Sequence, residues 1–378
     1  MNELKEKPFE YLRRKENNNY FEREIVDGWY LARAYVLKRL RDNNVYFKPD
    51  SDEHLHVILD GDSAPMLFIA RQIALTTHYI NFNEDACDET HRNRTIISLV
   101  SNNPDIKREL EKEEYLCNLP KYCKFVDINM NCENADSYID IEIHIVREVS
   151  EEYKHTLVFR KNEVEKFFEK AKDDDSFLCI DTRKAIYAGR MYDIGTIIQN
   201  LPAEDIHCTK RYSFALDVFQ HEKLKEKLIK MVDDTQWKKL SLSQIKEKLS
   251  CIMCADCFFM RKGCVELCGK DKMNVWEKYN EFLSKSEHAR WVVEKLIMGY
   301  RPLNAKERFY DESLHVQFNS KEQKEKFHNR IKRNDNDPAH IDICTYKHLR
   351  RINPDDLKYD SFLMLAIPKI LKKINEYN

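Results

Sequence analysis

The last hundred residues of this 378-residue chain contain aromatic rings and histidines whose types suit the binding of a small planar molecule. Trp291, Tyr300 and Tyr346 offer ring faces on which a flat ligand could stack. Groups able to supply hydrogen bonds or charge are His288, Arg290, Lys295, His340 and Asp342. Proteins hold purines and other planar heterocycles with stacked aromatics and a few convergent polar groups. The sequence therefore predicts a ligand-binding site built from these eight residues.

The spacing of three of these residues predicts that they lie together on one helix. His288, Trp291 and Lys295 are at i, i+3 and i+7, which places them on a common helical face. A structural interpretation stays open beside this one. Trp291 and Leu349 can belong to the hydrophobic core, and each histidine can satisfy a buried backbone group.

A second group of polar residues lies where the sequence predicts the ends of strands. The apolar run at residues 56–59 is typical of a strand, and Asp60, Gly61, Asp62 and Ser63 follow it. Sites in sheet folds lie at such strand ends. A candidate second site, for a hydrolase or a lyase acting on a nucleotide, therefore comprises Asp60, Asp62, Ser63 and Asp181. The same side chains are equally suited to capping helices.

The loop at residues 60–63 lacks the fingerprint of a dinucleotide-binding site. That fingerprint needs several glycines, so that amides at a helix N-terminus can approach a pyrophosphate. Here there is a single glycine, and Asp60 and Asp62 would repel a diphosphate. Glu84 lies near the position of a ribose-binding acid. We nevertheless expect no NAD-dependent redox chemistry, and the sequence predicts no cofactor.

Five cysteines fall within eighteen residues and raise the alternative of a metal site. They are Cys251, Cys254, Cys257, Cys264 and Cys268. Their number would suffice for tetrahedral zinc. However, the surrounding residues are apolar and helical, and spacings of three place the first three thiols along one side of a helix. There a free cysteine behaves as a small hydrophobic residue, so we favour structural thiols and predict no metal.

Composition excludes several classes of partner. The chain has 63 basic and 65 acidic residues, for a net charge of -2, so no overall field favours duplex nucleic acid. No window approaches the roughly 18 apolar residues of a membrane span, and the N-terminus lacks the apolar core of a signal peptide. Together with twelve cysteines interpreted as reduced thiols, this predicts a cytoplasmic protein.

The elements that must position these residues form an α/β pattern followed by helices. Residues 9–43 have apolar positions at helical spacing, which suits packing or assembly of a homo-oligomer. A helix is predicted at 66–75, with Asp62 or Ser63 as its N-cap and Pro65 in its first turn. Further strands are predicted at 79–82, 95–100, 124–128 and 177–180. Their alternation with helices indicates a mostly parallel sheet. Residues 139–145 and 156–159 predict a hairpin with one wet face.

We predict four segments from this pattern. A helical segment at 1–50 precedes a Rossmann-like α/β domain at 51–200, which includes a helix at 182–199. A helical connector at 201–275 then leads to an all-α domain at 276–378. The predicted fold class is thus α/β plus all-α.

The C-terminal segment resembles the RyR domain, the repeat found in ryanodine receptors and in many bacterial proteins. The positions that match its motif are His288, Trp291, Gly299, Tyr300, His340, Ile343, Tyr346, Leu349, Tyr359 and Asp360. Two positions depart from it: Tyr300 stands where Trp is common, and Thr345 stands where Pro is common. The α/β segment resembles, in degenerate form, the Rossmann-type domains of the TrkA-N kind that accompany RyR domains in some bacterial proteins.

This resemblance implies recognition of nucleotide-type or other small aromatic ligands, which in bacteria is associated with nucleotide-centred signalling, including antiphage defence. We therefore expect an intracellular sensor or regulator that binds a nucleotide or a nucleotide-derived molecule and is not an enzyme. Two alternatives stay open. One is a nucleotide-processing hydrolase or lyase that uses the α/β domain, and the other is a non-catalytic oligomeric scaffold.

Overall fold

The structure is a computed structural model that describes the greater part of the chain. Described are residues 20–86, 92–127, 132–133, 137–148, 153–173, 253–254, 256–269, 272–313, 321–332, 334, 337–354, 356–357, 360–361 and 364–365. The predicted strand at 177–180, the helix at 182–199 and the connector up to residue 252 lie outside the described residues. So do three residues singled out in the sequence, Asp181, Cys251 and Tyr359.

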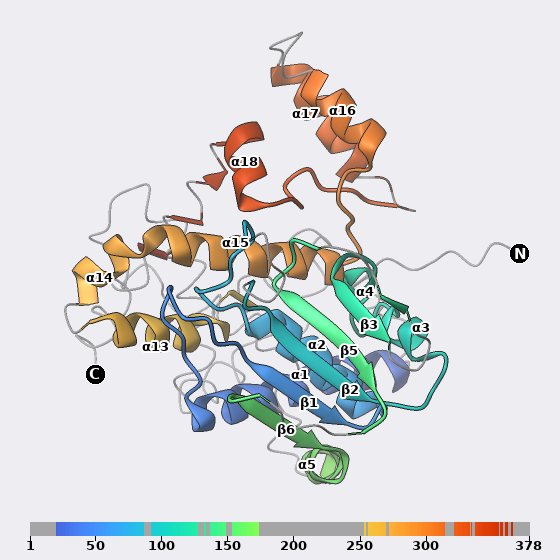
Figure 1. The fold of residues 1–378 in the computed structure, drawn as a ribbon. Helices are drawn as coiled ribbons and strands as arrows, with labels where there is room; N and C mark the ends of the chain where they lie inside the picture. The colour runs from blue at the N-terminus through green and yellow to red at the C-terminus, as the bar shows by residue number, and fades with distance from the viewer. Residues whose placement is uncertain are drawn as a thin grey trace, which may run out of the picture.

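A six-stranded sheet forms the centre of the molecule (Figure 1). Its strands are β1 (His56–Asp60), β2 (Thr95–Val100), β3 (Lys124–Asp127), β4 (Cys132–Glu133), β5 (Ile141–Val146) and β6 (Thr156–Arg160). The order across the sheet is β4-β3-β5-β2-β1-β6. Only β4 runs antiparallel to its neighbour, and the other five strands are parallel. The predicted mixture of helices with a mainly parallel sheet is confirmed.

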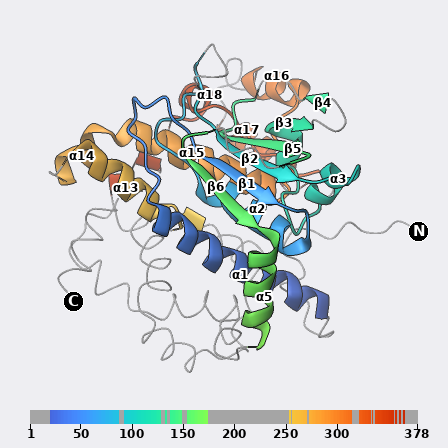
Figure 2. The ribbon, with the colours of Figure 1, turned by 60° about the horizontal axis from the view of Figure 1, so that its bottom comes forward.

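Three helices of the α/β part pack together: α1 (Tyr20–Asn43), α2 (Ala64–Thr76) and α5 (Lys161–Asp173). Figure 2 shows α1 and α5 on the same side of the sheet. Every residue of α2 from Met66 to Thr76 is buried, because this helix lies between the sheet and its neighbours. Ser63 is its N-cap and Pro65 lies in its first turn, as predicted. Short helices α3 (Ile106–Leu110) and α4 (Leu119–Tyr122) lie between β2 and β3 in the chain.

The C-terminal part is helical. It contains α13 (Phe258–Cys268), α14 (Lys272–Lys278), α15 (Asn280–Ile297), α16 (Ala305–Ser313), α17 (Lys321–Lys332) and α18 (Tyr346–Ile352). Helix α15 contacts α2 of the α/β part and also contacts α18 (Figure 1). Val293 and Leu296 of α15 belong to the large core that includes the sheet. Phe327 and Leu349 belong to a second, smaller core. Helix α15 is thus the structural link between the sheet and helices α16, α17 and α18.

The predicted hairpin of residues 139–145 and 156–159 is wrong. Strand β5 lies between β2 and β3, whereas β6 pairs with β1 two strands away, and all these pairings are parallel. The alternation of polar and apolar residues in β5 does not mark a wet face, because Glu142 is only 6% exposed. Its carboxylate instead lies 2.6 Å from His144 Nε2 and 3.1 Å from Lys124 Nζ. The side chains of His144 and Lys124 therefore contact Glu142 where the predicted wet face would have had water.

The predicted strand at 79–82 is also wrong. These residues form a turn after α2, although Tyr79 and Ile80 are buried at 4% and 2% exposure. Their apolar side chains fill the large core without joining the sheet. Short apolar runs do not distinguish a strand from a buried turn.

The order of the strands creates a topological switch point at β1. The chain passes from β1 to β2 on one side of it, and β6 later pairs on the other side. Ligands of open α/β sheets bind beyond the carboxyl ends of the strands at such a point. Gly61, which follows β1, has a φ of +129°, and a Cβ added there would lie 3.0 Å from Cδ of Lys161. Among the described residues, no helix combines the length and the apolar character needed to cross a membrane.

Candidate functional site

Five of the eight predicted ligand-binding residues come together between α15 and the 338–346 segment. We refer to them as the aromatic cluster: His288, Trp291, Tyr300, His340 and Tyr346. The His340 ring lies edge-on to Trp291, with centroids 4.8 Å apart, and 6.0 Å from Tyr300. The His288 ring is near-parallel to Trp291 at 6.2 Å and edge-on to Tyr346 at 5.8 Å. The structure therefore places rings that are 40 to 58 positions apart in the chain beside one another.

Backbone contacts fix the two segments that carry these rings. Gly299, with a φ of +85°, turns the chain at the end of α15, so that Tyr300 leaves the helix. Arg301 then forms a parallel bridge with Ala339, and the His340 N–H donates to the Arg301 carbonyl at 3.0 Å. The side chain of Asn118, from the α/β part, donates to the carbonyls of Gly299 and Tyr300 at 2.8 and 3.0 Å. The site is held by the α/β part as well as by the helices.

The hydrogen bonds of both histidines define which ring nitrogen carries the proton. The backbone N–H of Asp342 donates to Nδ1 of His340 at 3.3 Å, so the proton of a neutral ring is on Nε2. Burial, followed by the charges of Lys332 and Lys295, lowers the pKa of His340 well below its ordinary value. Burial also lowers the pKa of His288 to about 4, and its Nε2 donates to the Cys344 carbonyl at 2.9 Å. Both rings are therefore neutral near pH 7.

Lys295 and Asp342 lie at the margin of the aromatic cluster. The Lys295 ammonium is 5.3 Å from the centroid of the Trp291 ring, within the range of a cation–π contact, and 2.7 Å from Glu294 Oε1. Asp342 Oδ2 is 3.5 Å from Nδ1 of His340. Burial, and then the neighbouring Asp356, raise the pKa of Asp342 to about 6. Seven of the eight predicted residues are thus in or beside one cluster.

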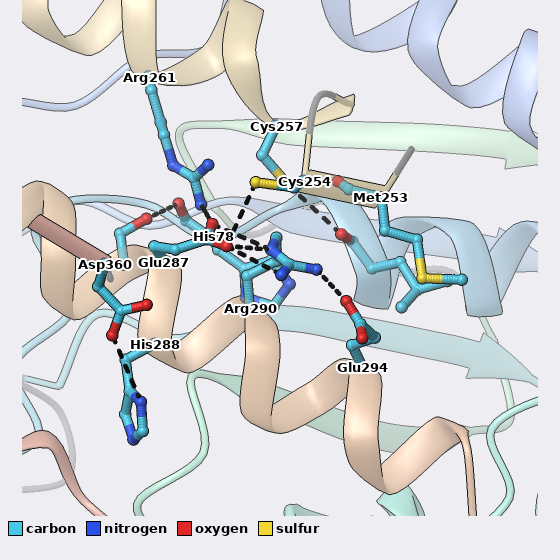
Figure 3. A network of polar contacts seen from close by, with 12 residues as sticks. His78, Met253, Cys254, Cys257, Arg261, Glu287, His288, Arg290, Glu294 and Asp360 are labelled. Atoms are coloured by element: carbon cyan, nitrogen blue, oxygen red, sulfur yellow. Dashed lines mark hydrogen bonds and ion pairs between the residues drawn. The ribbon is translucent and has the colours of Figure 1, made fainter. Parts of the chain in front are cut away.

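The eighth residue, Arg290, belongs to a different arrangement. We call it the buried ionic network: Arg261, Glu287, Arg290, Glu294 and Lys295. Arg290 donates to both oxygens of Glu287 at 2.9 to 3.0 Å and to Glu294 Oε2 at 2.5 Å. Arg261 of α13 donates to Glu287 Oε2 at 2.6 Å. Figure 3 shows that His288 and Arg290 leave α15 in different directions.

Sequence reasoning did not single out Glu287, Glu294 or Arg261. Glu287 and Glu294 lie at i−3 and i+4 from Arg290, a spacing that favours ion pairs on a helix and was available as a signal. The contact with Arg261 had no such signal, because α13 meets α15 only in the folded chain. Arg290 is 1% exposed and is not a surface group of the aromatic cluster.

A small pocket lies beside His288. It is lined by Phe82, Glu84, Tyr138, Ile139, Lys285, His288, Ala289, Val292 and Cys344. The volume of this cavity is about 20 Å³. That volume suits a water molecule and is too small for a nucleotide base.

The candidate second site lies at the carboxyl end of β1. Asp62 Oδ2 accepts a hydrogen bond from Ser101 Oγ, which follows β2, at 2.5 Å. Asp60 is the partner of Arg160 in the register of β1 and β6. Within the described part of the chain, the buried Ser63 hydroxyl has no hydrogen-bond partner, so this residue caps α2 by its backbone position. Asp181 lies outside the described residues, so the structure describes three of the four predicted residues.

The described cysteines of the cluster are mostly core residues. Cys254, Cys257 and Cys264 are at most 4% exposed, and Cys268 is half-buried. Burial raises the pKa of Cys257 and of Cys264 to about 12, which keeps both thiols protonated. In the described part of the chain, no three His, Cys, Asp or Glu side chains are arranged to hold a metal ion.

Comparison with known proteins adds no relative to this description. The chain matches no protein-family model, no curated protein and no solved structure. The resemblance to the RyR domain therefore rests on the motif positions of the sequence alone.

Proposed function

We propose that this protein is a sensor that binds a nucleotide or a nucleotide-derived small molecule on its aromatic cluster. The observation that supports the proposal is the convergence of Trp291, Tyr300 and His340 from two distant segments. All three side chains are only partly buried. They combine stacking faces with a neutral histidine whose Nε2–H can donate to a ligand. This is the chemistry that planar heterocycles require.

The ligand binds over the partly exposed rings and not in the small pocket beside His288. That pocket has room for water only, and the Glu84 carboxylate beside it already accepts hydrogen bonds from the N–H groups of Tyr346 and Lys347. Trp291, in contrast, is partly exposed. A base stacked there would contribute about 1–3 kcal/mol.

Binding at this position would reach the α/β part through the residues that follow His340. The Tyr138 hydroxyl, just before β5, donates to the Ile343 carbonyl at 3.1 Å. His288 holds the Cys344 carbonyl, and Glu84 holds the first turn of α18. A ligand that shifts His340 would therefore act on contacts between the C-terminal part and the α/β part. Such differential contact is what a ligand needs in order to shift a conformational equilibrium.

A thermal-shift screen of the full chain tests the proposal. The ligands are mononucleotides, cyclic nucleotides, NAD and ADP-ribose, each added to the wild-type chain, to Trp291→Ala and to Phe309→Ala. Phe309 is 75% exposed on α16 and serves as a control for loss of a surface ring. We expect a ligand to raise the Tm of the wild type and of Phe309→Ala but not of Trp291→Ala. Equal stabilisation of all three would refute this site.

A nucleotide-processing enzyme is the second candidate. It is favoured by the polar groups that meet at the switch point, where Asp62 and Ser101 are hydrogen-bonded beyond the ends of β1 and β2. Turnover of a nucleotide by the wild-type chain, lost in Asp62→Asn and retained in Trp291→Ala, would establish this function. Absence of turnover in the presence of a bound ligand would count against it.

A further inference from the structure

Helix α16 carries two neighbouring aromatic side chains that face solvent. Phe309 is 75% exposed and Tyr310 is 48% exposed, which makes them the most exposed large apolar side chains of the described residues. Figure 1 shows α16 and α17 beyond α15, away from the sheet. Contiguous exposed apolar side chains mark interaction surfaces, and aromatic residues are enriched at such surfaces. Helix α16 is therefore a candidate contact for another molecule.

The opposite side of α16 is polar and faces the rest of the protein. The Asn304 N–H donates to Glu307 Oε2, and the Glu307 N–H donates to Asn304 Oδ1, both at 3.0 Å. Asp311, which is 2% exposed, lies 2.7 Å from Nε2 of His328 on α17. Glu307 and Asp311 are about one helical turn apart and define the inward face. Because Phe309 lies midway between them in the sequence, it points to the other side of the helix.

The outward face of α16 has charges placed symmetrically about Phe309. Lys306 and Glu312 lie three residues before and three residues after this ring. The small residues Ala305 and Ser313 lie four residues before and four residues after it. At these spacings all four share a helical face with Phe309. Lys306 is exposed, and the Glu312 side chain is 41% exposed. One cation and one anion thus flank the ring at equal distances.

We propose that α16 is the contact of a homodimer, in which the helices of two copies pack antiparallel across a two-fold axis at Phe309. The axis places Lys306 of one copy at the level of Glu312 of the second copy, and the same pair recurs at the other end. The two Phe309 rings meet at the axis. The small side chains of Ala305 and Ser313 allow the two helices to approach. In a parallel pair, by contrast, each charge would face its own kind.

The described part of α1 has less to offer a second copy. The sequence had indicated residues 9–43 as an element for packing or for assembly of an oligomer. The apolar side chains Leu31, Val36 and Leu40 of α1 are at most 3% exposed and belong to the large core. They are therefore already covered within one chain, whereas Phe309 is not.

Sedimentation velocity of the full chain, from micromolar to submillimolar concentration, tests the proposal. We expect a weak dimer, because a helix of nine residues covers less than the roughly 1,200–2,000 Å² of a standard interface. Phe309→Asp should remove the dimer, since the axis sets its carboxylate against the same carboxylate of the second copy. The matched control is Phe282→Asp, whose ring is 40% exposed on α15. It should leave the dissociation constant of the dimer unchanged.

Two charge reversals test the antiparallel arrangement. Lys306→Glu and Glu312→Lys each replace two opposite-charge pairs by two like-charge pairs. Each variant alone should therefore associate at least about fivefold more weakly than the wild type. An equimolar mixture of the two variants contains dimers with both opposite-charge pairs. The mixture should associate about as tightly as the wild type.

Each outcome supports or overturns the proposal. If the wild type stays monomeric at submillimolar concentration, or if Phe309→Asp dimerises as tightly as the wild type, the contact is refuted. If Phe309→Asp is monomeric but the mixture of charge variants associates no better than either alone, the antiparallel pairing is refuted. No residue of the aromatic cluster lies on this face of α16, so these outcomes are independent of ligand binding.

Discussion

The carboxylate of Glu84 accepts a hydrogen bond from the backbone N–H of Tyr346 at 2.9 Å, so the α/β part supplies a cap for a helix of the C-terminal part. Its second oxygen accepts from the N–H of Lys347 at 3.0 Å. Thr345, the N-cap of α18, adds a side-chain bond to the His348 N–H. The first turn of α18 is thus satisfied from two sides, one of them 262 residues away in the chain.

Removing the carboxylate of Glu84 should loosen α18. We expect Glu84→Ala to lower the free energy of unfolding by about 1–2 kcal/mol, because two backbone N–H groups lose a charged acceptor. The control is Asp85→Ala, whose carboxylate is half exposed and lies 3.5 Å from Lys347 Nζ. Urea denaturation followed by circular dichroism would measure both. A similar loss in the two variants would contradict the capping role of Glu84.

Glu287 should be the most sensitive acid of the buried ionic network. Its removal leaves Arg261 and Arg290 facing each other without their shared partner, and breaking a buried ion pair in this way costs about 3–5 kcal/mol. Glu281 lies on the same helix, but it is exposed and pairs with Arg350 at 2.9 Å. Glu281→Ala should therefore cost less than about 1 kcal/mol. Chemical denaturation of Glu287→Ala and Glu281→Ala gives the comparison, and equal losses would refute it.

His288 should make stability depend on pH in a defined direction. Because burial lowers its pKa to about 4, the folded state keeps the ring neutral while the unfolded chain titrates near 6.5. Stability from this group is therefore present above pH 6.5 and declines as the pH falls toward 4. Asp360, whose pKa burial raises, acts in the opposite direction.

A variant isolates the contribution of His288. In His288→Gln the amide can still donate to the Cys344 carbonyl but does not titrate. Between pH 6.5 and 4, the wild type should lose on the order of 3 kcal/mol more than this variant. The measurement is the free energy of unfolding of both proteins across that range. Parallel curves would show that His288 is not held neutral by the fold.

Sequence patterns predicted the elements that depend on local signals. The strands that became β1, β2 and β3 and the buried helix α2 with its N-cap Ser63 followed from apolar runs and cap residues. The hairpin prediction failed because the alternation of polar and apolar residues gives only the positions of the polar residues in the sequence. It does not show that Arg94, Lys124 and His144 surround Glu142 in place of water.

In the candidate site, too, the residues that share one helix were predictable and the long-range contacts were not. The helical spacing of His288, Trp291 and Lys295 correctly placed two rings and a cation near one another. The motif spacing also grouped His340 with Trp291, and the centroids of these two rings lie 4.8 Å apart. The contributions of Asn118, Tyr138 and Glu84 were not predictable, because each is a contact between residues far apart in the chain.

The dissociation constant of the best nucleotide-type ligand for the wild type and for Trp291→Ala tests the central claim most directly. Far-UV circular dichroism and a thermal melt of both proteins would show that the variant is folded. Loss of one stacking face predicts that Trp291→Ala binds roughly 10 to 100 times more weakly, since a stacked base contributes about 1–3 kcal/mol. An unchanged dissociation constant in a folded Trp291→Ala protein would contradict the assignment of the ligand site to the aromatic cluster.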